Sequence, residues 1–540
     1  MVEESSHALC QGLRSLMNTS TSLARTIVRQ IVEAGVTDVV ISPGSRNAPL
    51  TMAFYEASQR KLITLHTRID ERTAAFFALG ITKATQRPVP IVCTSGTAVA
   101  NYHPAVLEAS HSNLPLLVIT ADRPAELRRT GANQTTEQAR IFGKAVRYFA
   151  DISGAAYPMV LPFNSLKSGP VHLNVQFSEP LNSDDDSDWL ANLAINPPED
   201  FKRKSAGTFF TKSTRGVLVV GHDRGGLSVS EVERFAKELG WPLISEDPLS
   251  FSSAISHASI FLTSQTITDE LAPDTVVVIG RTTLSRSINR LISTARKKIV
   301  VDPRILTVDG DRPADQKFTA IPTVEVQPVD SEYVDRWNKF SDRAAKKIAN
   351  INQWSEALVA REIGAGIPDG RTIFISSSRP IRDIEGFAVA RSGVETFANR
   401  GLAGIDGNIS TALGIASQRK ESIAVLGDLS FLHDLTGLIH HEAINLKIMV
   451  IDNNGGGIFS TLSHRGVAGF EEIFGTPHNL NLKKIAEAFG IPASIVSNQS
   501  ELRAELAKSI EGISLLVISV PDRDQNADFL QAIYSGVDSL

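Results

Sequence analysis

The sequence predicts an α/β protein of three domains, each built around a parallel β-sheet. Short apolar runs alternate with longer stretches of helical spacing along the whole chain, a pattern typical of the strand–helix units of parallel sheets. In addition, the stretch 92–109 resembles the stretch 425–443, and each is followed by another apolar strand, at Leu114 and at Leu446. We therefore expect the first and third domains to share a fold, the alternative being a chance match between two α/β units.

The runs expected to be buried strands are short and apolar. They lie at residues 39–42, 89–93, 116–120, 217–220, 275–279, 298–301, 372–375, 423–426, 447–451 and 515–520. Between them, helical spacing is clearest at 74–83 and 98–110.

Two polar stretches indicate domain boundaries. Residues 182–187 lead into a proline- and charge-rich run that ends at Ser205, and residues 339–353 carry a polar helical pattern before the strand at Thr372. The expected parts are an N-terminal extension at 1–17, a first domain at 18–190, a linker at 191–205, a central domain at 206–345 and a third domain at 355–540. Serine and threonine caps follow Met17, so we expect residues 1–16 to be an extension without catalytic importance.

Composition excludes several classes of protein. Apolar residues make up 42% of the chain and charged residues 21%, and the net charge of −5 argues against a general nucleic-acid binder. The two cysteines, Cys10 and Cys93, cannot form a disulfide framework or a cysteine zinc site, and a cytoplasmic location is the simplest expectation. No apolar run reaches the ~20 residues needed to span a bilayer, so stable membrane insertion is not expected.

The most informative motif pairs Gly427-Asp428 with Asn453-Asn454-Gly455. Asp428 and Asn453 are 25 residues apart, and each follows a predicted strand at the end where α/β folds bind ligands. A carboxylate, an amide oxygen and a backbone carbonyl are hard donors that suit Mg²⁺ or Mn²⁺ beside a diphosphate. The alternative is an aspartate N-cap and an Asn-Gly turn.

A second candidate is Glu71, in Asp70-Glu71-Arg72 at the start of a predicted helix. An acid in the first turn is commonly explained by the helix dipole alone, and that explanation stays open here.

Together these motifs resemble those of thiamine-diphosphate enzymes, which pair a pyrimidine-binding domain carrying one glutamate with a diphosphate-binding domain of the same fold. More narrowly, the chain resembles the 2-succinyl-5-enolpyruvyl-6-hydroxy-3-cyclohexene-1-carboxylate synthase family of menaquinone biosynthesis. The matching blocks lie at 41–50, 70–80, 93–109, 120–138, 399–414, 426–434 and 453–460. They cover the first and third domains from about residue 18 to 480, and the central domain resembles the family only loosely.

The resemblance implies a transferase that decarboxylates 2-oxoglutarate and adds the succinyl carbanion to isochorismate. Glu71 would hydrogen-bond the aminopyrimidine ring and so activate the cofactor, which carries out the carbanion chemistry. The implied metal ligands are Asp428, Asn453 and the carbonyl of Gly455. The other implied cofactor-binding residues are Gly427, Ser430, Phe459 and Ile405, the last with core packing as its alternative.

Both substrates are dicarboxylates, and arginine binds carboxylates bidentately while remaining charged. Each arginine taken alone is better explained by a surface or interface ion pair. The positions that match the family's substrate-binding residues are Arg46, Arg123, Asn133, Gln134, Arg286, Ser378, Arg382 and Arg400.

The chain departs at three places, one from thiamine-diphosphate enzymes at large and two from the narrower family. Thiamine-diphosphate enzymes at large have Gly-Asp-Gly where Leu429 stands here, although the narrower family shares the Leu-Ser version. Ser376-Ser377 replace the family's Gly-Asn, and the central domain offers only Arg286 where the family often has adjacent basic residues.

The resemblance further implies a homodimer or homotetramer. The alternatives are another thiamine-diphosphate carboligase or decarboxylase acting on a different 2-oxo acid, or a non-catalytic α/β protein. The second is disfavoured because Glu71, Asp428 and Asn453 are all present.

Overall fold

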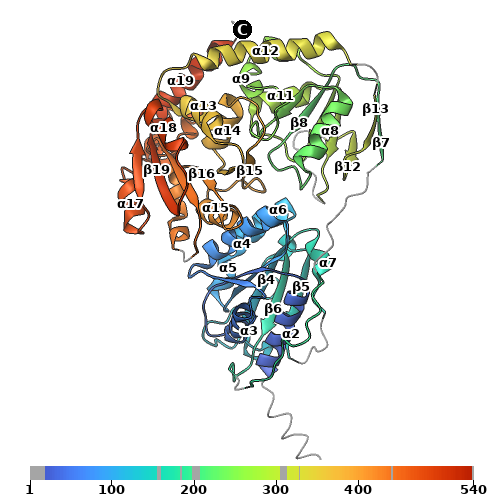
Figure 1. Ribbon diagram of the computed structural model, residues 1–540, viewed down its shortest axis with the longest axis vertical. Helices are drawn as coiled ribbons and strands as arrows, with labels where there is room; N and C mark the ends of the chain where they lie inside the picture. The colour runs from blue at the N-terminus through green and yellow to red at the C-terminus, as the bar shows by residue number, and fades with distance from the viewer. Residues whose placement is uncertain are drawn as a thin grey trace, which may run out of the picture. The chain divides into compact units, whose positions relative to one another are not determined.

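The computed structural model describes residues 19–154, 160–182, 185–196, 207–304, 313–326, 329–439 and 442–537. The chain forms two compact units (Figure 1). The first comprises residues 1–201 with 413–418 and 439–442, and the second comprises the remainder. The expected extension at 1–17 and residues 197–205 of the expected linker lie outside the described residues.

A six-stranded parallel sheet, ordered β2-β1-β3-β4-β6-β5, forms the centre of the first unit. Every residue of β3 and β4 is buried, as expected for central strands of a sheet covered on both faces. The strands are β1 Asp38–Ile41, β2 Thr64–Thr67, β3 Val89–Cys93, β4 Leu116–Asp122, β5 Tyr148–Ile152 and β6 Val171–Gln176. The helices are α2 Thr19–Glu33, α3 Ala48–Gln59, α4 Glu71–Thr85, α5 Thr97–Asn101, α6 His103–Ser112 and α7 Phe163–Leu166, with short η1 Ala125–Leu127 and η2 Gly143–Ala145.

The second unit contains a six-stranded parallel sheet ordered β15-β14-β16-β17-β19-β18. Its strands are β14 Thr372–Ile375, β15 Glu395–Phe397, β16 Ser422–Gly427, β17 Leu446–Asp452, β18 Ala493–Val496 and β19 Ile513–Ser519. The helices of this part are α13 Glu356–Gly366, α14 Arg379–Phe387, α15 Asn408–Ala416, α16 Asp428–His433, α17 Leu482–Ala488, α18 Gln499–Leu506 and α19 Arg523–Ser535. Short turns of helix are η3 Leu435–Leu438, η4 Phe459–Thr461 and the π-turn η5 Glu471–Gly475.

The two six-stranded sheets have the same topology. When the strands of each sheet are numbered from one to six in chain order, both sheets have the order 2-1-3-4-6-5. The resembling stretches 92–109 and 425–443 begin in β3 and β16, which occupy the same place in the two sheets. This confirms the prediction that the first and third domains share a fold.

A smaller parallel sheet, ordered β12-β11-β10-β8-β9, lies between them in the chain and belongs to the second unit. Its strands are β8 Gly216–Val220, β9 Leu243–Ser245, β10 Thr275–Ile279, β11 Lys297–Val301 and β12 Gln316–Phe318. Strands β7 Thr208–Thr211 and β13 Thr323–Val326 form a separate parallel pair. The helices are α8 Val229–Leu239, α9 Ala258–Phe261, α10 Gln265–Glu270, α11 Arg286–Thr294 and α12 Ser331–Ala349.

Helix α12 crosses the boundary expected at residue 345. It is amphipathic, and its buried face includes Tyr333, Trp337 and Phe340. These side chains belong to one continuous apolar core that also contains Val276 of β10 and Val425 of β16. In Figure 1 the helix passes over α9, and near its end the Lys347 ammonium donates to the carbonyl of Gly536 at 2.5 Å. The central sheet and the third sheet therefore share a core.

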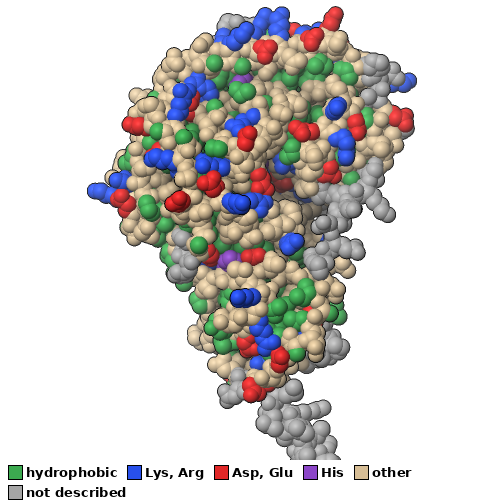
Figure 2. Space-filling view, viewed as in Figure 1, with side chains coloured by type: hydrophobic (Ala, Val, Ile, Leu, Met, Phe, Trp, Pro, Cys, Tyr) green, Lys and Arg blue, Asp and Glu red, His purple; other side chains and the backbone are tan. Residues whose placement is uncertain are grey.

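The surface of the second unit carries both signs of charge. On the face drawn in Figure 2, its basic and acidic side chains are interspersed. None of the described helices is both long enough and apolar enough to cross a membrane.

Candidate active site

The second unit brings polar residues to the carboxyl ends of three adjacent strands. β14 and β16 are neighbours, whereas β15, which lies between them in the chain, pairs on the other side of β14. Open α/β sheets bind ligands at such a reversal of strand order. Ser378, Asp428 and Asn453 follow β14, β16 and β17 within three residues.

Asp428 joins the loops that follow β16 and β17. It is 3% exposed; its Oδ1 accepts from the N–H of Leu429 at 2.6 Å and its Oδ2 from the N–H of Gly455 at 2.8 Å. Gly455 has a φ of 138°, and a Cβ there would lie 2.1 Å from the carbonyl oxygen of Gly475, so only glycine fits. Its own carbonyl accepts from the N–H of Gly457 at 2.9 Å and keeps a second lone pair.

The alternative explanation of this motif is partly wrong. The N-cap of α16 is Gly427, so Asp428 is not a helix cap. The turn after Asn453 does exist, with Asn454 at a φ of 61°.

Asn453 presents an unpaired oxygen. The side chain is 7% exposed, and its Nδ2 donates to the Oε1 of Glu356 at 2.5 Å. Its Oδ1 is buried and has no hydrogen-bond partner in the described part of the chain. A buried acceptor without a partner is costly unless something else binds it. Together with the Asp428 carboxylate and the Gly455 carbonyl, this oxygen fits a hard divalent cation.

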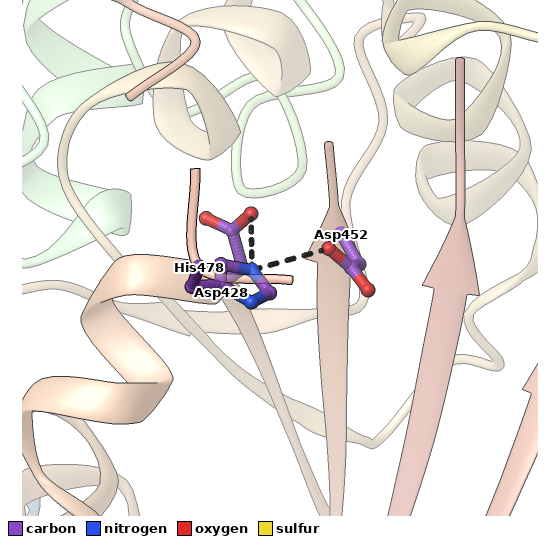
Figure 3. A group of neighbouring side chains, drawn as sticks. All are labelled: Asp428, Asp452 and His478. Atoms are coloured by element: carbon purple, nitrogen blue, oxygen red, sulfur yellow. Dashed lines mark hydrogen bonds and ion pairs between the residues drawn. The ribbon is translucent and has the colours of Figure 1, made fainter. Parts of the chain in front are cut away.

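His478 stands beside this group and was not predicted from the sequence. Its Nε2 lies 3.3 Å from Oδ2 of Asp428 and 3.5 Å from Oδ1 of Asp452 (Figure 3). The hydrogen bond to Asp428 raises the pKa of His478. The loop that carries His478 is held by Asn479, whose N–H donates to the Oδ1 of Asn454 at 2.8 Å. No spacing rule links this histidine to the aspartates, so a sequence pattern could not have found it.

The expected cofactor-binding residues lie in or next to the loops that follow β16 and β17, or are bonded to them. A Cβ on Gly427 would meet nothing within 4 Å, which leaves room for a bound group against the backbone. Ser430 is buried, accepts from the Asn408 amide at 2.8 Å and donates to the carbonyl of Ile405 at 3.2 Å. Ile405 itself is 43% exposed, so the alternative that it is a core residue is wrong. Phe459 is half-buried and its ring lies 5.5 Å from that of Phe474.

Arg400 forms an ion pair with the central domain. It is 5% exposed, and its Nε and Nη2 bind the two oxygens of Glu246 at 3.1 and 3.0 Å. Glu246 is 1% exposed and also accepts from the N–H groups of His222 and Leu284 at 3.0 and 2.8 Å. An interface ion pair, one of the alternatives for each arginine, is thus present at Arg400, and the pair fixes the orientation of the guanidinium.

Arg382 is half-buried and less fully paired. Its Nη1 donates to the carbonyl of Leu284, and its Nε is buried without a partner among the described residues. Burial lowers the pKa of Arg382, and repulsion from Arg379 and Arg286 lowers it further. The nearby Glu385 carboxyl has a raised pKa because of its own burial and of the charge of Glu246. An under-paired guanidinium of this kind is suited to an anionic ligand.

Two further expected residues lie in the same region. Arg286 is exposed and is the first residue of α11, close enough to Arg382 to act on its pKa. Ser378 stands at the N-cap position of α14 with a φ of 75° and makes no side-chain cap bond. Positive φ is rare for serine, and such strain concentrates at functional sites.

Glu71 is the first residue of α4 in the first unit. The neighbouring Asp70 is the N-cap, and its Oδ1 accepts from the N–H groups of Arg72 and Thr73 at 3.0 and 3.4 Å. Glu71 is therefore not needed to cap the helix. It is half-buried. The thiol of Cys93 lies nearby, with its pKa raised by burial and then by the charge of Glu71.

The first unit also brings together three of the expected substrate-binding residues. The Arg123 guanidinium donates to the Ser95 hydroxyl at 2.6 Å and to the Gln134 carbonyl at 2.5 Å. Burial, and then the positive charge of Arg46, lowers the pKa of Arg123. Arg46 itself binds Glu179 at 3.1 Å. Asn133, next to Gln134, is exposed.

A cavity of about 300 Å³ adjoins this cluster. Gly96, Thr97 and Gln134 contribute to its lining. Gln134 has a φ of 54°, and its side-chain Nε2 donates to the Ser95 carbonyl at 3.0 Å.

Three family descriptions match successive parts of the chain. Residues 21–141 match the N-terminal TPP binding domain of thiamine pyrophosphate enzymes, residues 182–375 the middle domain, and residues 387–520 the C-terminal TPP binding domain.

Among curated proteins, the chain is similar to 2-succinyl-5-enolpyruvyl-6-hydroxy-3-cyclohexene-1-carboxylate synthases along nearly its whole length. It is 36% identical to that of Saccharopolyspora erythraea, over 91% of this chain and 94% of the relative. The identity is 38% with that of a Nocardioides species, over 95% and 97%, and 36% with that of Thermobifida fusca, over 96% and 99%.

Proposed function

The chain belongs to the 2-succinyl-5-enolpyruvyl-6-hydroxy-3-cyclohexene-1-carboxylate synthase family of thiamine-diphosphate enzymes, and on this basis we propose its reaction. It decarboxylates 2-oxoglutarate and adds the resulting succinyl carbanion to isochorismate. The observation that carries the proposal is the cluster of Asp428, the unpaired Oδ1 of Asn453 and the Gly455 carbonyl at the ends of β16 and β17.

These three groups would hold a Mg²⁺ or Mn²⁺ ion, and through it the diphosphate of the cofactor. Gly427 and Ser430 would lie against the diphosphate. Ile405 and Phe459 would contact the apolar part of the cofactor. When bound, thiamine diphosphate supplies the carbanion chemistry. Glu71 would accept or share a proton at the aminopyrimidine ring, and the Asp70 cap, which leaves the Glu71 side chain unneeded for the helix start, supports this role.

The charged residues of the site would recognise the two dicarboxylates. Arg382 has an unpaired Nε, and Arg400 is held rigidly by Glu246, so a carboxylate would meet guanidinium groups that are already oriented. Arg286 and Ser378 would add contacts from the same unit. In the first unit, the proposed substrate-binding residues are Arg46, Arg123, Asn133 and Gln134. We also propose that the chain assembles as a homodimer, or as a dimer of dimers.

The proposed reaction is tested by carbon dioxide release. The full-length protein with thiamine diphosphate and Mn²⁺ should release carbon dioxide from 2-oxoglutarate, and isochorismate should increase the rate and be consumed with it. Pyruvate is the control, because it offers one carboxylate to a site with several cations. Faster turnover of pyruvate than of 2-oxoglutarate would support the alternative of another thiamine-diphosphate decarboxylase or carboligase.

Replacing Arg382 or Arg400 by alanine should separate recognition from stability. Loss of a charge-assisted contact should lower kcat/KM by roughly one to two decades in either variant, since such a contact contributes about 1.5–3 kcal/mol. Arg400→Ala also leaves Glu246 buried without its partner, which costs about 3–5 kcal/mol of folding free energy. Its melting temperature should therefore fall well below that of Arg382→Ala.

Cofactor activation should be unaffected in both variants. Proton–deuterium exchange at the reactive carbon of thiamine diphosphate, followed by NMR, should stay near the wild-type rate. A severe loss of exchange in either variant would show that its arginine is not confined to substrate recognition.

A further inference from the structure

Glu356 contacts Asn453 from a distant part of the chain. It is the first residue of α13, is 6% exposed and lies 97 residues before Asn453. Its Oε1 accepts from the Nδ2 of Asn453 at 2.5 Å, and no sequence motif singled it out.

The chemistry of the contact determines which way the Asn453 amide points. An ionised carboxylate has acceptors only, whereas an amide has a donor end and an acceptor end. The NH₂ group of Asn453 must therefore face Glu356. Its Oδ1 then points away, where it is buried and has no partner in the described ranges. The reversed amide would place two acceptors against each other at hydrogen-bond distance.

Glu356 is itself held in place. Its backbone N–H donates to the Oδ1 of Asn526 at 2.9 Å, and its Oε2 lies 3.5 Å from the Nε of Arg379. Arg379 is in turn hydrogen-bonded to Asp383, one turn further along α14. One carboxylate oxygen thus meets a cation while the other meets the Asn453 amide, which orders both.

We propose that Glu356 is a positioning residue that selects the orientation of the Asn453 amide and so presents Oδ1 to the divalent cation. The proposal rests on the metal site of the proposed function. Groups that orient a metal ligand typically change metal affinity by about 10- to 100-fold when they are removed. The loss of metal affinity would be measurable before any substrate binds.

The first test is Glu356→Gln in the full-length protein. Because Arg379 attracts the amide oxygen introduced at position 356, its NH₂ would face Asn453, whose own amide would then turn its oxygen away from the cation site. Mn²⁺ affinity, measured by electron paramagnetic resonance of free Mn²⁺ with thiamine diphosphate present, should fall about tenfold or more.

Glu362→Gln is the matched control. Glu362 lies on the same helix, is 4% exposed and is paired with Arg361 and Arg503. Its replacement disturbs a buried carboxylate of similar environment away from Asn453. Mn²⁺ affinity should remain within about twofold of wild type.

The decisive test reverses the polarity of the contact. In Glu356→Gln combined with Asn453→Asp, the new amide donates to one oxygen of the new carboxylate and leaves the other for Mn²⁺. The double variant should bind Mn²⁺ about tenfold more tightly than Glu356→Gln and than Asn453→Asp alone, in which two carboxylates face each other. If Glu356→Gln fails to fold, the double variant is compared with Asn453→Asp.

Two results would overturn the proposal: a folded Glu356→Gln with wild-type Mn²⁺ affinity, or an Asn453→Asp single variant that binds as tightly as the double one. Failure of the proposed function gives a different result from failure of this proposal. The wild-type protein would then show no cofactor-dependent Mn²⁺ binding at all.

Discussion

Replacing Glu71 by glutamine is expected to slow proton–deuterium exchange at the reactive carbon of thiamine diphosphate by about 10²–10⁴-fold, the usual contribution of a positioned acid or base. Glutamine has nearly the same size and can form hydrogen bonds, but it cannot take part in the proton transfer. Every later step should slow by a similar factor, whichever 2-oxo acid is offered. The exchange is followed by NMR with no substrate present.

Asp70→Asn provides a control one residue away. Asp70 caps α4 through its side-chain oxygen, and asparagine is an equally good N-cap, so the helix should keep its start. The substitution removes a negative charge beside Glu71 and leaves the Glu71 carboxylate in place. Exchange close to the wild-type rate is expected. Fast exchange in Glu71→Gln would remove the glutamate from cofactor activation.

Replacing Asp428 by alanine is expected to abolish retention of thiamine diphosphate. The substitution removes one proposed cation ligand and the acceptor for the N–H groups of Leu429 and Gly455. The loop after β16 thereby loses its side-chain hydrogen bond to the loop after β17. A near-ultraviolet circular dichroism titration should show no saturable cofactor signal at concentrations that saturate the wild-type protein.

The wild-type protein treated with a chelator should behave in the same way and should recover when Mn²⁺ is restored. Asp428→Ala cannot recover, because its defect is in the ligand. Full cofactor retention by metal-free wild-type protein would contradict the proposed role of the cation.

The central strands of each sheet were predictable because their apolar runs are continuous. The edge strands β2 and β15 were missed, since they are short and partly exposed. β6 was missed for another reason: it is buried but contains His172 and Asn174. Both are hydrogen-bonded to the Thr120 hydroxyl of β4, at 2.8 and 2.9 Å, and a pairing of this kind is visible only after the strands have come together.

The residues of the candidate site likewise divide into those that a local sequence pattern predicted and those that it missed. Asp428, Asn453 and Gly455 were found because their motif is local to the ends of two strands. The groups that orient site residues were not, because they come from remote positions. Glu246 lies 154 residues from Arg400, and Glu356 lies 97 residues from Asn453. A buried acid in the first turn of a helix has an ordinary explanation in the helix dipole, so Glu356 carries no signal of its own.

The shared core beneath α12 limits how this enzyme can be recombined. Trp337 and Phe340 pack in the same apolar cluster as residues of both larger sheets of the second unit. No boundary between the central and third domains therefore leaves this cluster intact. A chimera that takes the central domain from a relative at 36% identity would juxtapose side chains selected against different neighbours. Grafts that exchange the whole of residues 207–537 keep the cluster intact, and libraries built on that larger block should yield more folded members.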